Sequence, residues 1–124
     1  MTASIPILIV DDNPSNTKLL VFLLQAKGYD VRSAANADEA LAVIAEHRPR
    51  LILMDLQLPG MDGLTLTRKL KADPATQDIS IIAATAYAMR GDEERARAAG
   101  CDGYITKPID TRQLPADIAR FLAS

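Results

Sequence analysis

The residues best suited to chemistry are three carboxylates, one hydroxyl and one amine, each placed just after a short apolar run: Asp11, Asp12, Asp55, Thr85 and Lys107. Three carboxylates brought together repel one another, and a hard cation with oxygen ligands relieves that repulsion. Mg²⁺ fits such a site, because it accepts one or two carboxylates, keeps several waters and binds phosphate oxygens. A carboxylate beside it can attack a phosphoryl group and hold it as an aspartyl phosphate. An ammonium group and a hydroxyl can then bond the remaining phosphoryl oxygens.

Each of these residues has a simpler explanation when it is taken alone. Asp11 and Asp12 precede a proline and could be acids that cap a helix. Asp55 could begin a turn, Thr85 could be a loop or cap hydroxyl, and Lys107 could be a solvated side chain. Separate causes of this kind need not place all five at one edge of a fold, so the elements that carry them decide the interpretation.

Short apolar runs alternate along the chain with longer amphipathic segments. The runs predict strands over residues 7–10, 29–33, 51–54, 79–84 and 104–106. Helices are expected from Pro14 to 25, over 37–44, 64–71 and 91–99, and from about 114 to 121. The alternation predicts an α/β fold: a doubly wound, five-stranded parallel sheet with five helices. For the strand order we expect the flavodoxin-like 2-1-3-4-5, one of the common orders of such sheets. Ligands of such sheets bind at the carboxyl ends of the strands, where these side chains would meet.

Two helices carry details that can be checked. The first contains four apolar residues, Leu19, Leu20, Leu23 and Leu24, and is expected to stop before Gly28. In the last, Pro115 falls where a helix capped by Asp110 would already be running and would clash with a carbonyl one turn back. That helix is therefore expected to start late or to have a distorted first turn.

Composition narrows the function classes. Residues 1–124 are expected to form one domain with no output domain, since the pattern ends with the fifth helix. Fourteen basic and sixteen acidic residues leave a net charge of −2, which argues against a general electrostatic interaction with nucleic acid or an anionic membrane. Cys101 has no disulfide partner and is expected to be buried. With no signal peptide and no apolar run of about 20 residues, a cytoplasmic location without membrane insertion is expected.

Four segments resemble the receiver domains of two-component response regulators: VDDN at 10–13, LMDLQLPGMDG at 53–63, ATA at 84–86 and GYITKP at 103–108. They occur in order, at suitable spacing, and the likeness spans nearly the whole chain. Residues 86–95 are also similar to single-domain cell-division regulators of the DivK type and to receivers attached to hybrid histidine kinases.

The resemblance implies roles at the site. Asp55 would accept the phosphoryl group, and Asp12, helped by Asp11, would hold Mg²⁺, for which Mn²⁺ can substitute. The main-chain carbonyl of Gln57 would complete the protein ligands, while Thr85 and Lys107 would assist the transfer. By the same resemblance, Lys107 and Pro108 would be joined by a cis peptide bond.

The resemblance also implies a switch and partners. Thr85 and Tyr104 would form a switch pair that reshapes the face made by the fourth helix, the fifth strand and the fifth helix, where a downstream effector would bind. The donor would be a histidine kinase or a histidine phosphotransfer protein. Apart from the resemblance, Gln57 and Tyr87 each follow a site residue by two positions, from which they could orient the hydrolytic water and tune dephosphorylation, or could be ordinary residues at the rim of the site. Such a protein catalyses only its own phosphoryl transfer and slow autodephosphorylation.

Other readings of the same residues are possible. A haloacid-dehalogenase-like phosphatase would carry a second acid two residues after its nucleophile, where this chain has Gln57. A flavodoxin-like mononucleotide binder would need a phosphate-friendly first loop, whereas Asp11 and Asp12 make that loop acidic. An inert receiver-like adaptor would not need the three aspartates, the threonine and the lysine together, yet this chain has all five. Within the receiver interpretation, an effector-binding adaptor and a relay to a histidine phosphotransfer protein both stay open.

Overall fold

Strands and helices alternate along the whole chain. A computed structural model describes residues 4–58, 60–85 and 91–123. Its elements, in chain order, are β1 (Pro6–Val10), α1 (Pro14–Gln25), β2 (Asp30–Ala34), α2 (Ala37–Glu46), β3 (Leu51–Asp55), α3 (Gly63–Ala72), β4 (Ser80–Thr85), α4 (Asp92–Ala99), β5 (Gly103–Thr106) and α5 (Leu114–Ala123). The strands form one sheet of order β2-β1-β3-β4-β5, and every neighbouring pair is parallel. The predicted fold class and strand order are confirmed.

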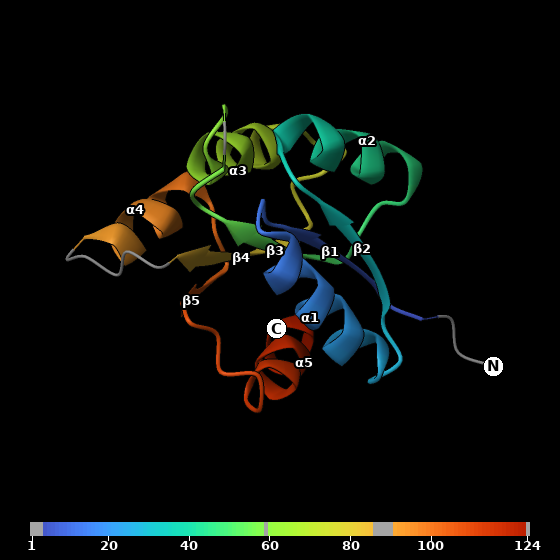
Figure 1. The fold of residues 1–124 in the computed structure, drawn as a ribbon. Helices are drawn as coiled ribbons and strands as arrows, with labels where there is room; N and C mark the ends of the chain where they lie inside the picture. Colours follow the sequence, from blue (N-terminus) through green and yellow to red (C-terminus); the bar gives the residue numbers. More distant parts are fainter. Residues whose placement is uncertain (1–3, 59, 86–90, 124) are drawn as a thin grey trace.

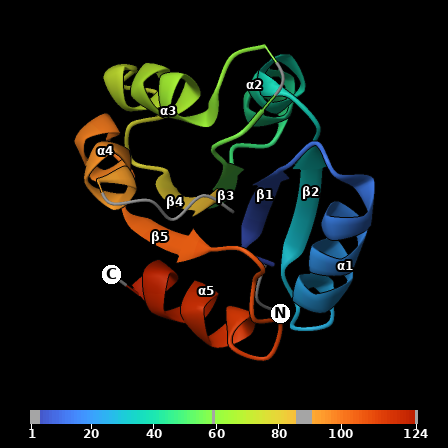
Figure 2. The ribbon, with the colours of Figure 1, turned by 60° about the vertical axis from the view of Figure 1, so that its left-hand side comes forward.

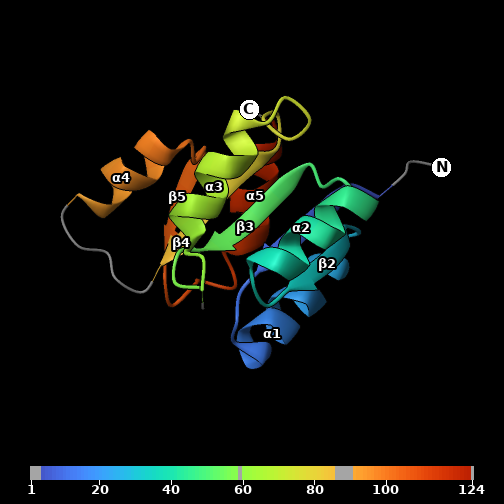
Figure 3. The ribbon, with the colours of Figure 1, turned by 90° about the horizontal axis from the view of Figure 1, so that it is seen from above.

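The helices cover both faces of this sheet. α1 and α5 lie on one face, and α2, α3 and α4 lie on the other (Figure 1). Because successive side chains of a strand point to opposite faces, each central strand supplies both cores. Ile7 and Ile9 of β1 face α1 and α5, whereas Leu8 and Val10 face α2 and α3. Figure 3 shows the layer of α2, α3 and α4 from above. Among the described residues, no helix is both long enough and apolar enough to span a membrane.

The apolar residues of α1 divide between the core and the surface. The structure buries Leu20 and Leu24, but leaves Leu19 48% exposed and Phe22 69% exposed. A helix turns by about 100° per residue, so the rotation of α1 against the sheet decides which of its apolar residues are buried. Cys101 is buried as expected.

The late start expected for the last helix is confirmed. Asp110 closes a turn before α5: its carbonyl accepts from the Leu114 N–H at 2.9 Å and its carboxylate from the Arg112 N–H at 3.0 Å. α5 begins only at Leu114, which places Pro115 in the first turn. The N–H groups of a first turn have no intrahelical acceptor, so a proline is tolerated there.

At the edge opposite the carboxyl ends of the strands, one lysine joins several elements. Lys71, in the last turn of α3, donates through Nζ to the carbonyls of Gln77 (3.1 Å) and Ile79 (2.7 Å) and to the Asp102 carboxylate (2.9 Å). The same Asp102 oxygen accepts from the Ile81 N–H of β4 at 2.9 Å. The Lys71 side chain is only 20% exposed, so solvent cannot easily replace these contacts.

Replacing Lys71 with Met is expected to lower the free energy of unfolding by about 1.5–3 kcal/mol, the scale of hydrogen bonds made by a charged group. Urea denaturation followed by circular dichroism measures the change. Lys69→Met is the matched control, because Lys69 is exposed on the same helix, and it should change stability by about 0.5 kcal/mol or less. Equal losses in the two variants would contradict an anchoring role for Lys71.

Candidate functional site

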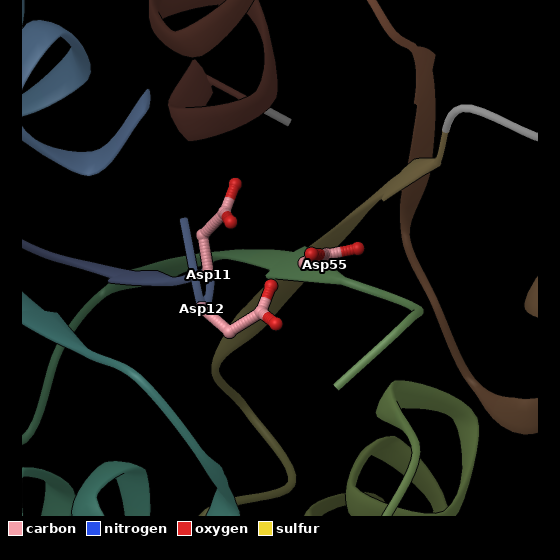
Figure 4. A group of neighbouring side chains, drawn as sticks. All are labelled: Asp11, Asp12 and Asp55. Atoms are coloured by element: carbon pink, nitrogen blue, oxygen red, sulfur yellow. The ribbon is translucent and has the colours of Figure 1, made fainter. Parts of the chain in front are cut away.

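The carboxyl ends of four adjacent strands bring the candidate residues to one edge of the sheet. Asp11 and Asp12 directly follow β1, Asp55 is the last residue of β3, Thr85 is the last residue of β4, and Lys107 directly follows β5. Each of the three aspartates has a carboxylate oxygen within 4.8 Å of those of the other two. Figure 4 shows these side chains projecting from the neighbouring ends of β1 and β3. The predicted convergence of the three carboxylates is therefore observed.

Lys107 lies between two of the carboxylates. Its Nζ is 3.0 Å from Asp11 Oδ2 and 3.3 Å from Asp55 Oδ2. Asp11 and Asp55 are each only 5% exposed, whereas Asp12 is exposed. The backbone N–H of Lys107 also donates to the Thr85 carbonyl at 2.7 Å, and this hydrogen bond fixes the Lys107 backbone beside β4.

Burial and charge shift two groups of the site. Burial raises the pKa of Asp55, and the nearby charge of Asp11 adds to this, although the Gln57 N–H and Lys107 act in the opposite direction. Burial lowers the pKa of Lys107, but Asp11 and Asp55 together outweigh it, so the net pKa is raised. Lys107 is therefore a stable cation here, and Asp55 is a carboxylate that a single ammonium does not fully compensate.

The segment after Asp55 folds back closely on the acceptor. The Gln57 N–H donates to Asp55 Oδ1 at 2.9 Å, and the Leu56 N–H donates to the Ala84 carbonyl at 3.1 Å. A side chain on Gly63 would place its Cβ 2.5 Å from the Asp55 carbonyl oxygen, so only glycine lets α3 begin this close to β3. These contacts put the Gln57 main chain beside the acceptor, while metal ligation by its carbonyl stays a prediction.

The remaining candidate residues lie on β4, on β5 and directly after β5. Thr85 is buried at the end of β4, and Tyr104 is half-buried on the neighbouring strand β5, against the core beneath α2, α3 and α4. The Lys107–Pro108 peptide bond is cis. Tyr87 lies outside the described residues.

The donor set fits a divalent cation. Three carboxylate oxygens lie close together, and oxygen is the ligand that Mg²⁺ prefers. In the described part of the chain, the Asp12 carboxylate takes part in no hydrogen bond or ion pair, which leaves its oxygens open to a cation. Asp11, Asp12, Asp55 and the Gln57 carbonyl are the groups that could hold one.

Two further residues near the site were not anticipated from the sequence. Gly63 packs against the acceptor strand, and Thr17 donates its hydroxyl to the Asp11 carbonyl at 3.3 Å. The position of Gly63 directly after the Gly60-Met61-Asp62 turn was a usable signal for a close approach. Thr17 gave none, because a threonine six residues after an aspartate has no characteristic pattern.

Comparison with known proteins agrees with this geometry. The family model "Response regulator receiver domain" matches residues 7–119. The polar-differentiation response regulator DivK of Brucella anthropi is 47% identical over 116 residues, covering 94% of both chains. DivK of Brucella ovis is 46% identical over 122 residues, covering 98% of both.

Solved structures show the same fold. A putative response regulator from Chloroflexus aurantiacus superposes with a TM-score of 0.92 at 32% identity, covering 98% of this chain and all of the other. The receiver domain of the sensor histidine kinase PA1611 from Pseudomonas aeruginosa, which has magnesium coordinated in its active-site cleft, superposes with a TM-score of 0.88 at 35% identity and the same coverage. With its acidic edge and strand order, this chain belongs to the response regulator receiver domain family, and it is a phosphoacceptor signalling protein rather than an enzyme with a separate substrate.

Proposed function

We propose that Asp55 accepts a phosphoryl group from a phosphohistidine donor in a Mg²⁺-dependent reaction. The observation that carries the proposal is the position of Asp55: a buried carboxylate at a strand end, beside two other carboxylates and within 3.3 Å of Lys107. A carboxylate oxygen of Asp55 attacks phosphorus as the phosphorus–nitrogen bond breaks, and the electron pair of that bond stays on the imidazole nitrogen. The second ring nitrogen of the phosphohistidine carries a proton, so the products are an aspartyl phosphate and a neutral histidine.

Charge neutralisation is the main requirement of this transfer. When bound, Mg²⁺ supplies positive charge to the phosphoryl oxygens, and Asp11, Asp12, Asp55 and the Gln57 carbonyl are the residues that would hold it. Magnesium in the cleft of the similar PA1611 receiver supports this choice of cation. Lys107 provides the second positive charge from its place between Asp11 and Asp55.

The phosphorylation signal would reach an effector protein through the face formed by α4, β5 and α5. The Thr85 hydroxyl bonds a phosphoryl oxygen and moves toward it, and Tyr104 on the adjacent strand rotates into the space that Thr85 vacates. This is a local charge change that biases a two-state element. An effector protein would then bind that face, and Gln57 with Tyr87 would set how quickly water removes the phosphoryl group.

The surface that binds the phosphohistidine donor includes α1. Leu19 and Phe22 are the large apolar side chains exposed in the described part of the chain. Ser15 and Ala26 extend their row at spacings of four, three and four residues, which is the seam spacing of packed helices. A groove of about 380 Å³ runs from Leu19 to Lys107, between α1 and the segment before α5. Figure 2 shows α1 and α5, which cover the same face of the sheet. A helix that carries the phosphohistidine would pack on the seam.

Incubation with acetyl phosphate and Mg²⁺ should add one phosphoryl group to the protein, as measured by intact mass. The adduct should be absent in Asp55→Asn, since the amide is not a nucleophile, and it should be lost when a chelator removes the metal. Asp78→Asn is the matched control, because Asp78 is exposed and remote from the site, and it should be labelled like the wild type. Labelling of Asp55→Asn would contradict the assignment of the acceptor.

Without metal, Asp55→Asn should raise the free energy of unfolding at pH 7 by about 1 kcal/mol, because it removes an incompletely compensated buried charge. Folding raises the pKa of Asp55, so the stability linked to this group is present at acid pH and is lost as the pH rises through that raised pKa. The advantage of the variant should therefore shrink towards pH 4. Thermal melts at a series of pH values test this, and an advantage that is independent of pH would count against it.

Phe22→Ala should slow phosphoryl transfer from a protein donor about tenfold, the usual effect of truncating a central aromatic contact. Labelling by acetyl phosphate should not change, since that donor needs no docking. The probes are the cytoplasmic parts of the histidine kinases of the source organism, phosphorylated with ATP and tested one by one against the wild type. Arg68→Ala, an exposed change on α3, is the control. If no kinase labels the wild type, the phosphohistidine donor itself is wrong.

A further inference from the structure

The position of the Asp12 carboxylate depends on the backbone of that residue, because no described residue bonds the side chain. Asp11 beside it has fixed side-chain contacts, since its carboxylate accepts from the Asn13 N–H at 2.9 Å and pairs with Lys107 at 3.0 Å. The Asp12 carboxylate has no such partner among the described residues, yet it lies within 4.8 Å of the carboxylates of Asp11 and Asp55 (Figure 4). Whatever orients the backbone on either side of Asp12 therefore sets the geometry of the acidic cluster.

One side chain bonds the peptide group that leads into Asp12. The Asp11 N–H donates to the Ala34 carbonyl at 3.0 Å, which continues the pairing of β1 with β2. The Asp11 carbonyl belongs to the planar Asp11–Asp12 peptide group, and it accepts from the Thr17 hydroxyl at 3.3 Å. The hydroxyl therefore restrains the tilt of that plane, and with it the direction in which the Asp12 side chain leaves the backbone.

The contact of Thr17 differs from the ordinary behaviour of threonine in helices. Thr67, on α3, bonds the carbonyl four residues earlier, Gly63, at 2.7 Å, which is a contact within one helix. Thr17 instead bonds a carbonyl six residues earlier, outside α1, and so links the helix to the end of β1. Its own N–H donates to the Asn13 carbonyl at 3.0 Å, which fixes the Thr17 backbone in the first turn of α1. This is a tertiary contact between two elements.

We propose that Thr17 is a positioning residue for the divalent-cation site: its hydroxyl holds the Asp11–Asp12 peptide group so that the Asp12 carboxylate faces Asp55. The inference rests on the proposed Mg²⁺-dependent function and names a determinant of cation affinity in this chain. Groups that orient metal ligands from behind typically change metal affinity 10–100-fold when they are removed. The 3.3 Å contact places Thr17 at the low end of that range.

Thr17→Val should weaken Mg²⁺ binding about tenfold, as measured by isothermal titration calorimetry on the full chain. Valine keeps the shape of threonine and removes only the hydroxyl, so the thermal melt should stay close to that of the wild type. Thr17→Ser keeps the hydroxyl and should bind within about twofold of the wild type. Thr65→Val, on an exposed residue of α3, is the matched control and should bind like the wild type. In metal-free protein, the Asp12 amide resonance should shift in Thr17→Val but not in Thr17→Ser.

Three results would decide against the inference. Wild-type affinity in Thr17→Val would show that water replaces the hydroxyl at no cost. Equal weakening in Thr17→Val and Thr17→Ser would assign the effect to the methyl group rather than to the hydrogen bond. If the wild type itself binds no Mg²⁺, the proposed cation dependence is wrong and the inference falls with it, which separates the failure of the function from the failure of the role of Thr17.

Discussion

Repulsion among three carboxylates at one edge of a sheet is the constraint that the site has to meet. Two charges 4 Å apart near a protein surface interact with about 4 kcal/mol. Asp11, Asp12 and Asp55 carry three negative charges against the single positive charge of Lys107, which leaves a local charge of −2. A carboxyl group that is buried and incompletely compensated is costly for a fold, and functional sites commonly carry such a cost. A cation and a phosphoryl group bring the charges that balance it.

The scaffold supports this edge because its strands are parallel. Their carboxyl ends coincide, so residues from four strand ends that are far apart in the sequence reach one place without any long loop. α3 connects the two edges of the sheet: it begins at Gly63, in close contact with the Asp55 backbone, and carries Lys71 in its last turn. The acceptor is thus joined through one short helix to the contacts of Lys71 at the far edge.

The helices α1 and α4 differ in the polarity of their exposed surfaces. α1 exposes Leu19 and Phe22, and its first turn contains no acid. α4 lies on the opposite face of the sheet. Among its described side chains, those of Ala96 and Ala99 are buried, and an exposed Glu93–Arg97 pair lies on its surface. Buried methyl groups cover little apolar area and contribute little packing energy. Of the two helices, α1 therefore offers the more apolar surface.

By itself, the sequence determined the fold class and the set of residues at the carboxyl edge. These depend on local signals: apolar runs of strand length, prolines and glycines at element ends, and the polar residue that directly follows each strand. The strand order was expected from the flavodoxin-like fold as a whole, because no local signal encodes it. The late start of α5 followed from Pro115 for the same reason, since a missing N–H acts locally.

Only the tertiary structure decided which charges pair and which stay unpaired. The contact of Lys107 with both Asp11 and Asp55, the lack of a partner for Asp12 in the described chain, and the Thr17 hydroxyl on the Asp11 carbonyl all depend on how helices and loops pack on the sheet. The exposure of Leu19 likewise depends on the rotation of α1 against its neighbours. Residue types and spacing fix which groups can reach an edge, but pairing at 3 Å is set by side-chain direction, which emerges only when the elements are packed together.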